Sequence, residues 1–222
     1  MALRAVVFDY GMVLTGPQDP EARSALLRMT GLPPNRFEEL YWADRHAYDE
    51  GKLTGLAFWQ KFLRAAGLSS EGGASPSEAG QLDRVAHELN LWDARMWTTE
   101  NPAMVAWQLE LKNRGFLTAI LSNMGDNVHE NMQRELPWLS RFDVLVWSYQ
   151  LLMAKPEPAI YLHVLKELGT TPEETLFLDD KLVNIEAAQA LGMRAIQFST
   201  VEKLRADLIA AGLDAELPLP QA

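Results

Sequence analysis

The 222-residue sequence contains no cysteine. A chain without thiols can form neither a disulfide framework nor a thiolate zinc site, and it is compatible with a reducing, cytoplasmic setting. Its catalytic chemistry is therefore left to carboxylate, hydroxyl, lysine and histidine side chains. Long apolar runs are missing as well: no stretch approaches the ~18 apolar residues of a membrane span, and the N-terminus lacks the basic start of a signal peptide. We expect a cytoplasmic protein with no membrane partner.

Basic residues are few relative to acidic ones, with 20 Lys and Arg against 30 Asp and Glu and a formal net charge of −10 at pH 7. Because no basic run offsets this charge, we expect no nucleic-acid partner. An anionic substrate would need local cations, such as a bound metal or one or two lysines. The length suits one core domain with a smaller elaboration, and the sequence leaves a homo-oligomer open.

Five apolar runs of strand length recur along the chain, with helical patterns between them, at 3–8, 116–121, 144–147, 175–178 and 194–198. The first run is continuous and rich in β-branched residues, which is typical of a parallel strand buried on both faces. Strands that alternate with helices predict the α/β class, with a doubly wound, Rossmann-like parallel sheet. The crossover helices are expected at 101–112, 156–168, 182–191 and 200–211.

About a hundred residues separate the first two predicted strands, whereas a crossover needs only ~12. Helical patterns fill this stretch at 20–30, 34–48, 55–66 and 76–90. We therefore predict a small helical bundle inserted after the first strand as a cap, with the core at 1–15 and 98–222 and the cap at 16–97. The SSEGGASPSEAG segment at 69–80 is interpreted as a flexible joint within the cap, because helical patterns flank it.

Polar residues follow the first two strands. Asp9 ends the first strand, where ligands bind in open α/β sheets, and Gly11 would let the backbone turn sharply so that a carbonyl faces the same spot. A capping role for Asp9 in the next turn is an equally good interpretation. Ser122 and Asn123 follow the second strand. A hydroxyl and backbone N–H groups there suit a phosphate oxygen, although Ser-Asn is also ordinary turn chemistry.

Charged residues mark two further loops. Lys155 precedes a proline that favours an extended approach, so the lysine can point inward at a carboxylate and an anionic substrate, although most lysines are simply solvated. Asp179 and Asp180 end a hydrophobic strand, and Asn184 follows one helical turn later. Adjacent carboxylates repel each other unless a cation compensates, and such oxygen ligands suit Mg²⁺. A helix N-cap with an acidic first turn is the alternative, but it explains one aspartate better than two.

Four motifs, FDYGMVL, LSN, KP and FLDDKLVNIEAAQALG, occur in this order at plausible spacing. Through them the sequence resembles the haloacid dehalogenase superfamily of hydrolases from residue 3 to about 198, with the inserted helices in the place of that superfamily's cap. It is most similar to the branch that contains sugar-phosphate phosphatases and the phosphatase half of epoxide hydrolases, whose fourth motif is also Asp-Asp with an Asn four residues later.

This resemblance implies a role for each motif residue. Asp9 looks like the nucleophile that forms an aspartyl-phosphate, and Mg²⁺ would be held by Asp9, the Gly11 carbonyl and Asp180. The phosphate would be bound by Ser122, the backbone N–H of Asn123, and Lys155, which would hold Asp9 and the phosphoryl group together. Asp179 and Asn184 would orient the lysine or a metal-bound water.

One departure from the family pattern concerns the proton donor. Most phosphatases of the superfamily carry a second Asp two residues after the nucleophile, and such a group typically supplies ~10²–10⁴-fold in rate. Here that position is Gly11, and Met12 replaces the usual glycine. Slow turnover of poor leaving groups is expected unless another donor comes from the cap or the substrate. Gly also occurs at this position in the sugar-phosphatase-like branch.

The cap carries a stretch, HAYDEGKLTGLAFW at 46–59, that resembles the cap signature of the same branch. Trp42, Arg45, His46 and Tyr48 are candidates for facing the active site. For the aromatic residues, an amphipathic helix that buries Trp42, Phe58, Trp59 and Phe62 is the favoured interpretation. For Arg45 and His46, contact with substrate and a place in such a helix remain equally open.

Three functions are consistent with these features. The leading one is a Mg²⁺-dependent hydrolase of phosphomonoesters, acting on a small phosphorylated metabolite. The second is dehalogenation of a 2-haloacid by the same Asp nucleophile without metal, although such sites typically lack the acidic fourth motif. The third is a catalytically weak binding or regulatory protein on this scaffold, a reading motivated by Gly11.

Overall fold

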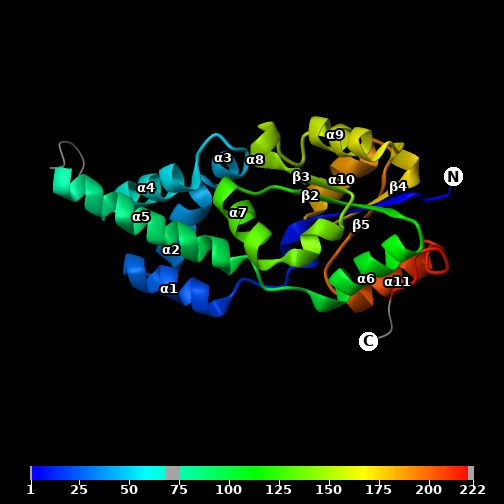
Figure 1. Ribbon diagram of the computed structural model, residues 1–222, viewed down its shortest axis with the longest axis horizontal. Coiled ribbons are helices and arrows are strands. Elements are labelled where there is room, and N and C mark those ends of the chain that lie inside the picture. Colours follow the sequence, from blue (N-terminus) through cyan, green and yellow to red (C-terminus); the bar gives the residue numbers. More distant parts are fainter. Residues whose placement is uncertain (1, 69–75, 220–222) are drawn as a thin grey trace.

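A computed structural model describes residues 2–68 and 76–219 (Figure 1). Its centre is a sheet of five parallel strands in the order β3-β2-β1-β4-β5. The strands are β1 (Ala5–Phe8), β2 (Leu117–Ser122), β3 (Val144–Trp147), β4 (Thr175–Asp179) and β5 (Arg194–Gln197). Phe8 pairs with Ile120 and Leu178, so the carboxyl ends of the three central strands lie level with one another. All five predicted strands are present, and the α/β prediction is confirmed.

Helices cover both faces of this sheet. The side chains of β1 alternate between two apolar clusters, as a strand buried on both faces requires. Val6 and Phe8 pack with α6 (Pro102–Asn113), α7 (Asp126–Glu135) and α11 (Val201–Ala210), whereas Ala5 and Val7 pack with α9 (Pro158–Leu168) and α10 (Leu182–Ala190). Short elements complete the connections: α8 (Ser148–Leu151) and the 3₁₀ helices η2 (Pro137–Arg141) and η3 (Pro172–Glu174). The sheet is therefore doubly wound.

The remaining helices form a bundle at one end of the molecule (Figure 1). They are α1 (Pro20–Thr30), α2 (Pro34–Ala43), α3 (Arg45–Asp49), α4 (Gly55–Ala65) and α5 (Pro76–Met96). The bundle has an aromatic core of its own, built around Phe37, Tyr41, Phe58, Trp59 and Phe62. Thr54 caps α4 as its sequence suggests, because its hydroxyl accepts a hydrogen bond from the Ala57 N–H at 3.2 Å. None of the described helices is long and apolar enough to cross a membrane.

Two neighbouring segments connect the bundle to the sheet. Thr15 and Glu100 form an antiparallel bridge, the Gly16 N–H donates to the Thr99 carbonyl at 2.8 Å, and the Asn101 N–H donates to the Leu14 carbonyl at 2.9 Å. Hydrogen bonds therefore pair the outgoing and returning chains. We define the bundle as residues 20–96 and the core as the sheet with its flanking helices.

Several helices differ from the sequence-based predictions. The helix expected at 34–48 is broken at Asp44, whose backbone is not helical (φ −116°, ψ 8°). The last bundle helix continues beyond residue 90 to Met96. The polar helix α7 was not predicted, because only three of its ten side chains are buried and its apolar signal is weak. Much of the joint predicted at 69–80 lies outside the described residues.

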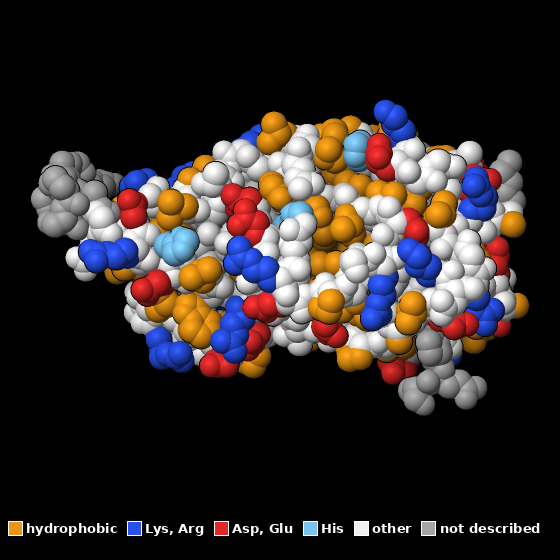
Figure 2. Space-filling view, in the orientation of Figure 1, with side chains coloured by type: hydrophobic (Ala, Val, Ile, Leu, Met, Phe, Trp, Pro, Cys, Tyr) orange, Lys and Arg blue, Asp and Glu red, His pale blue; other side chains and the backbone are white. Residues whose placement is uncertain are grey.

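The surface seen in Figure 2 mixes Lys and Arg with Asp and Glu side chains over both bundle and core. Trp138 and Trp147 are buried in the core, with exposed fractions of 4% and 2%.

Candidate active site

A cavity of about 270 Å³ opens where the carboxyl ends of β1, β2 and β4 meet the bundle. Its walls come from both parts of the chain. The core contributes Asp9, Tyr10, Gly11, Met12, Ser122, Asn123, Met124, Val128, Lys155, Asp180, Lys181 and Asn184, and the bundle with its connections contributes Gln18, Trp42, Arg45, Asp49 and Trp97. Strand ends thus supply the charged floor and helices the cover, as expected for a ligand site in an open α/β sheet.

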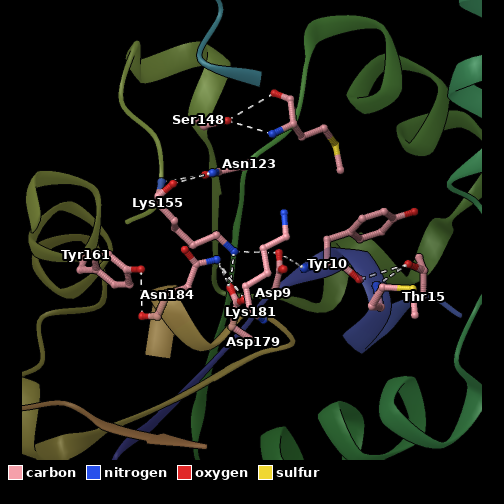
Figure 3. Close-up of polar contacts among 12 residues, drawn as sticks. Asp9, Tyr10, Thr15, Asn123, Ser148, Lys155, Tyr161, Asp179, Lys181 and Asn184 are labelled. Carbon is pink, nitrogen blue, oxygen red and sulfur yellow. Dashed lines mark hydrogen bonds and ion pairs between the residues drawn. The ribbon is translucent and has the colours of Figure 1, made fainter. Parts of the chain in front are cut away.

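Lys155 is the centre of the charged floor. Its ammonium group lies 2.9 Å from Asp9 Oδ1 and 2.7 Å from Asp179 Oδ2 (Figure 3). Asp9 directly follows β1 and also accepts a hydrogen bond from the Tyr10 N–H at 2.7 Å. Both carboxylates and the lysine are buried, with exposed fractions of 7%, 0% and 2%. Burying these charges is costly unless they are paired, so the lysine is a structural requirement of this floor.

Asp179 is held by more donors than Asp9. The Asn184 amide donates to both carboxylate oxygens at 3.0 Å, and the Lys181 backbone N–H donates to Oδ1 at 2.8 Å. Asp179 therefore holds Lys155 in place without lining the cavity itself, whereas Asp9 lines the cavity. Asn184 lines the cavity as well, so the predicted pair Asp179 and Asn184 lies where it can orient Lys155.

The acid groups of the floor are hard to ionise together. Burial raises the pKa of Asp9 to about 7, the Lys155 charge opposes this rise, and the charges of Asp179 and Asp180 add to it. Burial and the neighbouring Asp179 likewise raise the pKa of Asp180. For Lys155, the two carboxylates outweigh the effect of burial and raise its pKa. The floor therefore carries an excess of negative charge that favours binding of a further cation.

Three carboxylates offer that cation its ligands. Asp9, Asp179 and Asp180 can each present an oxygen so that the three atoms lie within 4.8 Å of one another. Asp180 is only partly buried and lines the cavity beside Asp9. Hard oxygen donors in a cluster of this size fit a hard divalent ion such as Mg²⁺.

Ser122 and Asn123 lie at the end of β2, as the sequence predicts, but their side chains do different things. Ser122 is buried and lines the cavity, and its hydroxyl has no hydrogen-bond partner among the described residues. The Asn123 side chain instead clamps the backbone of Lys155, accepting from its N–H and donating to its carbonyl at 2.8 Å each. This clamp aims the lysine inward, and no local pattern in the sequence indicates it.

The backbone after Asp9 differs from the sequence-based expectation. Gly11 has φ −64° and ψ 133°, which any residue adopts, and a Cβ atom placed there would meet nothing within 4 Å. The left-handed residue is Met12, with φ 61°. The sharp turn is thus made at Met12, one residue later than predicted, and this conformation is sterically strained for a residue with a Cβ atom. Neither the backbone nor packing excludes an aspartate at position 11.

The four candidates on the bundle separate into three groups. Trp42 and Arg45 line the cavity, and Trp42 is 47% exposed rather than buried in the bundle as favoured above. Tyr48 is fully buried, and its ring lies where a Cβ on Gly125 of the core would be. His46 is away from the cavity lining, with a side chain 70% exposed and 3.5 Å from Glu50. The structure thus brings Arg45 to the site and leaves His46 at the surface.

Sequence reasoning missed Asp49. It lies one helical turn after Arg45, lines the cavity and accepts a hydrogen bond from Arg45 Nε at 2.8 Å. The available signal was the i,i+4 spacing of an arginine and an aspartate on a predicted helix. Arg45 is also 3.5 Å from the buried Asp93 and lies over the rings of Tyr41, Tyr48 and Trp97.

A covered α/β sheet with a carboxylate, a lysine and an acidic cluster at its strand ends defines a hydrolase-type site. The sequence profile of the haloacid dehalogenase-like hydrolases matches residues 3–192, and the chain belongs to this family. The predicted resemblance is confirmed, and the protein is a hydrolase of this family.

Curated relatives include phosphatases. The chain is 39% identical to the sesquiterpene phosphatase astK of Aspergillus oryzae over 154 residues, covering 65% of this chain and 74% of the relative. It is 29% identical to a phosphatase of Mycobacterium tuberculosis over 199 residues, covering 88% and 87%. Identity to the mouse bifunctional epoxide hydrolase 2 is 35% over 207 residues, covering 88% of this chain but only 36% of that protein.

Solved structures show the same fold. A HAD family enzyme of Bacteroides thetaiotaomicron, crystallised with magnesium and inorganic phosphate, superimposes with a TM-score of 0.69 at 21% identity, covering 91% of this chain and 99% of that one. At this identity the likeness concerns the fold alone.

Proposed function

We propose that the protein is a metal-dependent phosphomonoesterase that acts on a small phosphorylated metabolite through an aspartyl-phosphate on Asp9. The observation that carries this proposal is the Lys155 ammonium bridging Asp9 and Asp179 on the floor of the cavity, with Asp180 beside them. A carboxylate fixed by a cation at the end of a strand can attack an electrophile in the cavity. The phosphatases among its relatives support phosphorus as that electrophile.

The residues present fit a divalent ion. Asp9 and Asp180, with the Gly11 carbonyl, would hold Mg²⁺ on the cavity side of the acidic cluster. When bound, the ion supplies positive charge that offsets the repulsion between Asp9 and the phosphate and stabilises charge in the transition state. The raised pKa of Asp9, about 7, supports this role. A divalent cation close to Asp9 would lower that pKa and so favour the ionised carboxylate that attacks phosphorus.

Side chains and backbone groups of the cavity would bind the substrate. Ser122, which lines the cavity and whose hydroxyl has no hydrogen-bond partner in the described part of the chain, and the backbone N–H of Asn123 would bind phosphate oxygens. Lys155 would hold the phosphate against Asp9 and neutralise part of the combined charge. Asp179 and Asn184 keep the lysine in place, and Arg45 with Trp42 would contact the alcohol part of the substrate.

The test is hydrolysis of a panel of phosphate monoesters, aryl, sugar, nucleotide and terpenyl, by the purified protein with Mg²⁺ and with EDTA. We expect phosphate release with the metal and its loss with the chelator. Asp9→Asn should abolish release while the variant stays folded, because the amide keeps the size of the side chain and its contact with the Tyr10 N–H.

Two other outcomes decide between the remaining functions. Chloride release from 2-chloropropionate in EDTA would indicate attack of Asp9 on carbon and would replace the proposal. No turnover of any substrate, together with tight binding of one phosphate ester, would indicate a binding or regulatory protein.

A further inference from the structure

The proposed phosphatase lacks an obvious proton donor. At Gly11 no side chain is available to protonate the departing alcohol or to activate the water that later attacks Asp9. Uncatalysed departure of an alkoxide is slow, and a positioned acid typically contributes about 10²–10⁴-fold. Another group on the cavity walls would therefore have to move the proton.

Asp49 is the one carboxylate that the bundle contributes to the described cavity walls. The floor, with Asp9, lies at the ends of the sheet strands, and α3 belongs to the cover. In an in-line displacement the leaving oxygen departs on the side of phosphorus away from the attacking carboxylate. A cover residue is therefore on the side where the leaving group needs its proton, and where the second-step water arrives.

The side chain of Asp49 is held with one oxygen free. Arg45 Nε donates to Oδ1 at 2.8 Å, and no other protein group among the described residues binds this carboxylate by a hydrogen bond or ion pair. Its side chain retains 15% exposure, toward the cavity it lines. Oδ2 is thus available to a substrate, while Oδ1 fixes the plane of the group. Arg45 acts here as a positioning residue.

The backbone near Asp49 contacts the core at two points. The Ser148 hydroxyl (labelled in Figure 3) accepts from the Met124 N–H at 2.8 Å and donates to the Asp49 carbonyl. Two residues later, Gly51 has φ 79° and packs so closely that a Cβ would come within 2.4 Å of the Tyr149 carbonyl oxygen. A catalytic group needs such pre-organisation.

We propose, on the basis of the phosphatase function above, that Asp49 is the general acid and base of the reaction and replaces the carboxylate absent at position 11. In the first step Asp9 forms a bond to phosphorus, the bond from phosphorus to the alcohol oxygen breaks, and that oxygen takes the proton of Asp49. In the second step water attacks phosphorus, Asp49 accepts its proton, and the bond to Asp9 breaks to release phosphate. Asp49 ends protonated, ready for the next cycle.

The charges around Asp49 are compatible with both roles. Burial raises its pKa above the usual value, and Asp93 adds to the rise, while the Arg45 guanidinium and the more distant Lys181 oppose it. A carboxyl group in such balanced surroundings can hold a proton for the first step and accept one in the second.

The test compares Asp49→Asn with Asp93→Asn on two substrates in Mg²⁺. Asp93 is a matched control, since it is also a buried carboxylate beside Arg45 but does not line the cavity. We expect D49N to lose about 10²–10⁴-fold in kcat/KM on an alkyl phosphate. On 4-nitrophenyl phosphate, whose leaving group needs no proton, phosphoenzyme should form rapidly and accumulate. D93N removes one contribution to the raised pKa of Asp49 but not the carboxylate itself, so it should lose far less on the alkyl phosphate and should not accumulate phosphoenzyme.

Further variants and outcomes decide whether Asp49 has this role. The double variant G11D/D49N should recover much of the lost rate, because a side chain fits at position 11. Equal losses on both substrates, or a loss matched by D93N, would overturn the role of Asp49. If thermal unfolding shows that D49N does not fold, Asp49→Ser takes its place with the same expectations. A wild-type protein inactive on every phosphate ester would refute the phosphatase proposal itself. If wild type is active and D49N behaves like D93N, only the role of Asp49 is refuted.

Discussion

Replacing Lys155 with methionine tests the electrostatic logic of the floor. The substitution keeps most of the apolar stem of the side chain and removes the ammonium that lies 2.7 Å from Asp179 and 2.9 Å from Asp9. Asp179 keeps the Asn184 amide and the Lys181 N–H, but Asp9 keeps only the Tyr10 N–H. Removing one partner of a buried ion pair typically costs about 3–5 kcal/mol, so we expect a loss of that size in the free energy of unfolding.

The loss should depend on pH in a defined direction. Without Lys155 the pKa of Asp9 in the folded state rises beyond its present value of about 7, whereas in the unfolded state it keeps its ordinary value of 3.8. At pH values between the two, the folded protein binds a proton that the unfolded protein has released. A folded-state pKa raised in this way contributes stability below the unfolded pKa, and that stability is lost as pH rises through the folded pKa. The deficit of K155M should therefore be smaller near about pH 5 than near about pH 8.

The assay is urea unfolding in metal-free buffer at both pH values, with free energies from linear extrapolation. Lys181→Met is the matched control, because Lys181 also lines the cavity but its side chain is exposed. A surface change of this kind usually stays within about 0.5 kcal/mol. If K155M unfolds with the free energy of K181M, or if its deficit grows on acidification, the account of the floor is wrong.

Three further predictions concern other parts of the chain. Asp143→Asn should destabilise the protein by about 1–3 kcal/mol at neutral pH, because its carboxylate accepts from the Thr118 N–H at 2.9 Å and binds Lys112. These contacts outweigh burial and lower the pKa of Asp143 below its ordinary value of 3.8. The stability difference between wild type and D143N should therefore shrink when urea unfolding is repeated at pH values below 3.8. Gly125→Ala should cost about 1–3 kcal/mol, measured the same way, since its Cβ would come within 2.1 Å of the Tyr48 ring; Gly67→Ala, at an unpacked left-handed glycine, should cost less. Gly11→Ala should fold with unchanged thermal stability, because a Cβ there meets nothing within 4 Å, and a lowered melting temperature would contradict the open space at that position.

The sheet and its charged strand ends were predictable from the sequence for a physical reason. Strands buried on both faces are continuous apolar runs, and the carboxyl ends of parallel strands meet at one edge, so Asp9, Ser122 and Asp180 had to converge once the strands were assigned. Lys155 was placed by the proline that follows it, which favours an extended approach, and by its motif.

What the sequence could not predict depends on contacts between distant segments. The Asn123 clamp on Lys155 and the docking of Asp49 on Ser148 join residues 32 and 99 positions apart, with no periodic signal. The sharp turn after the first strand was assigned to Gly11, but the residue with the left-handed backbone is Met12. Trp42 was placed in the bundle core by helical periodicity, which identifies an apolar face without telling whether that face meets protein or a cavity.

The central claim is that Asp9 carries the phosphoryl group during turnover. Its most direct test is to quench the protein with acid during turnover of 4-nitrophenyl phosphate in Mg²⁺ and to map the peptides by mass spectrometry. We predict one added phosphoryl group on the peptide that contains Asp9, its absence in Asp9→Asn, and its accumulation in D49N. Turnover of the ester without any phosphoryl group on that peptide, or with the group on another residue, would contradict the claim.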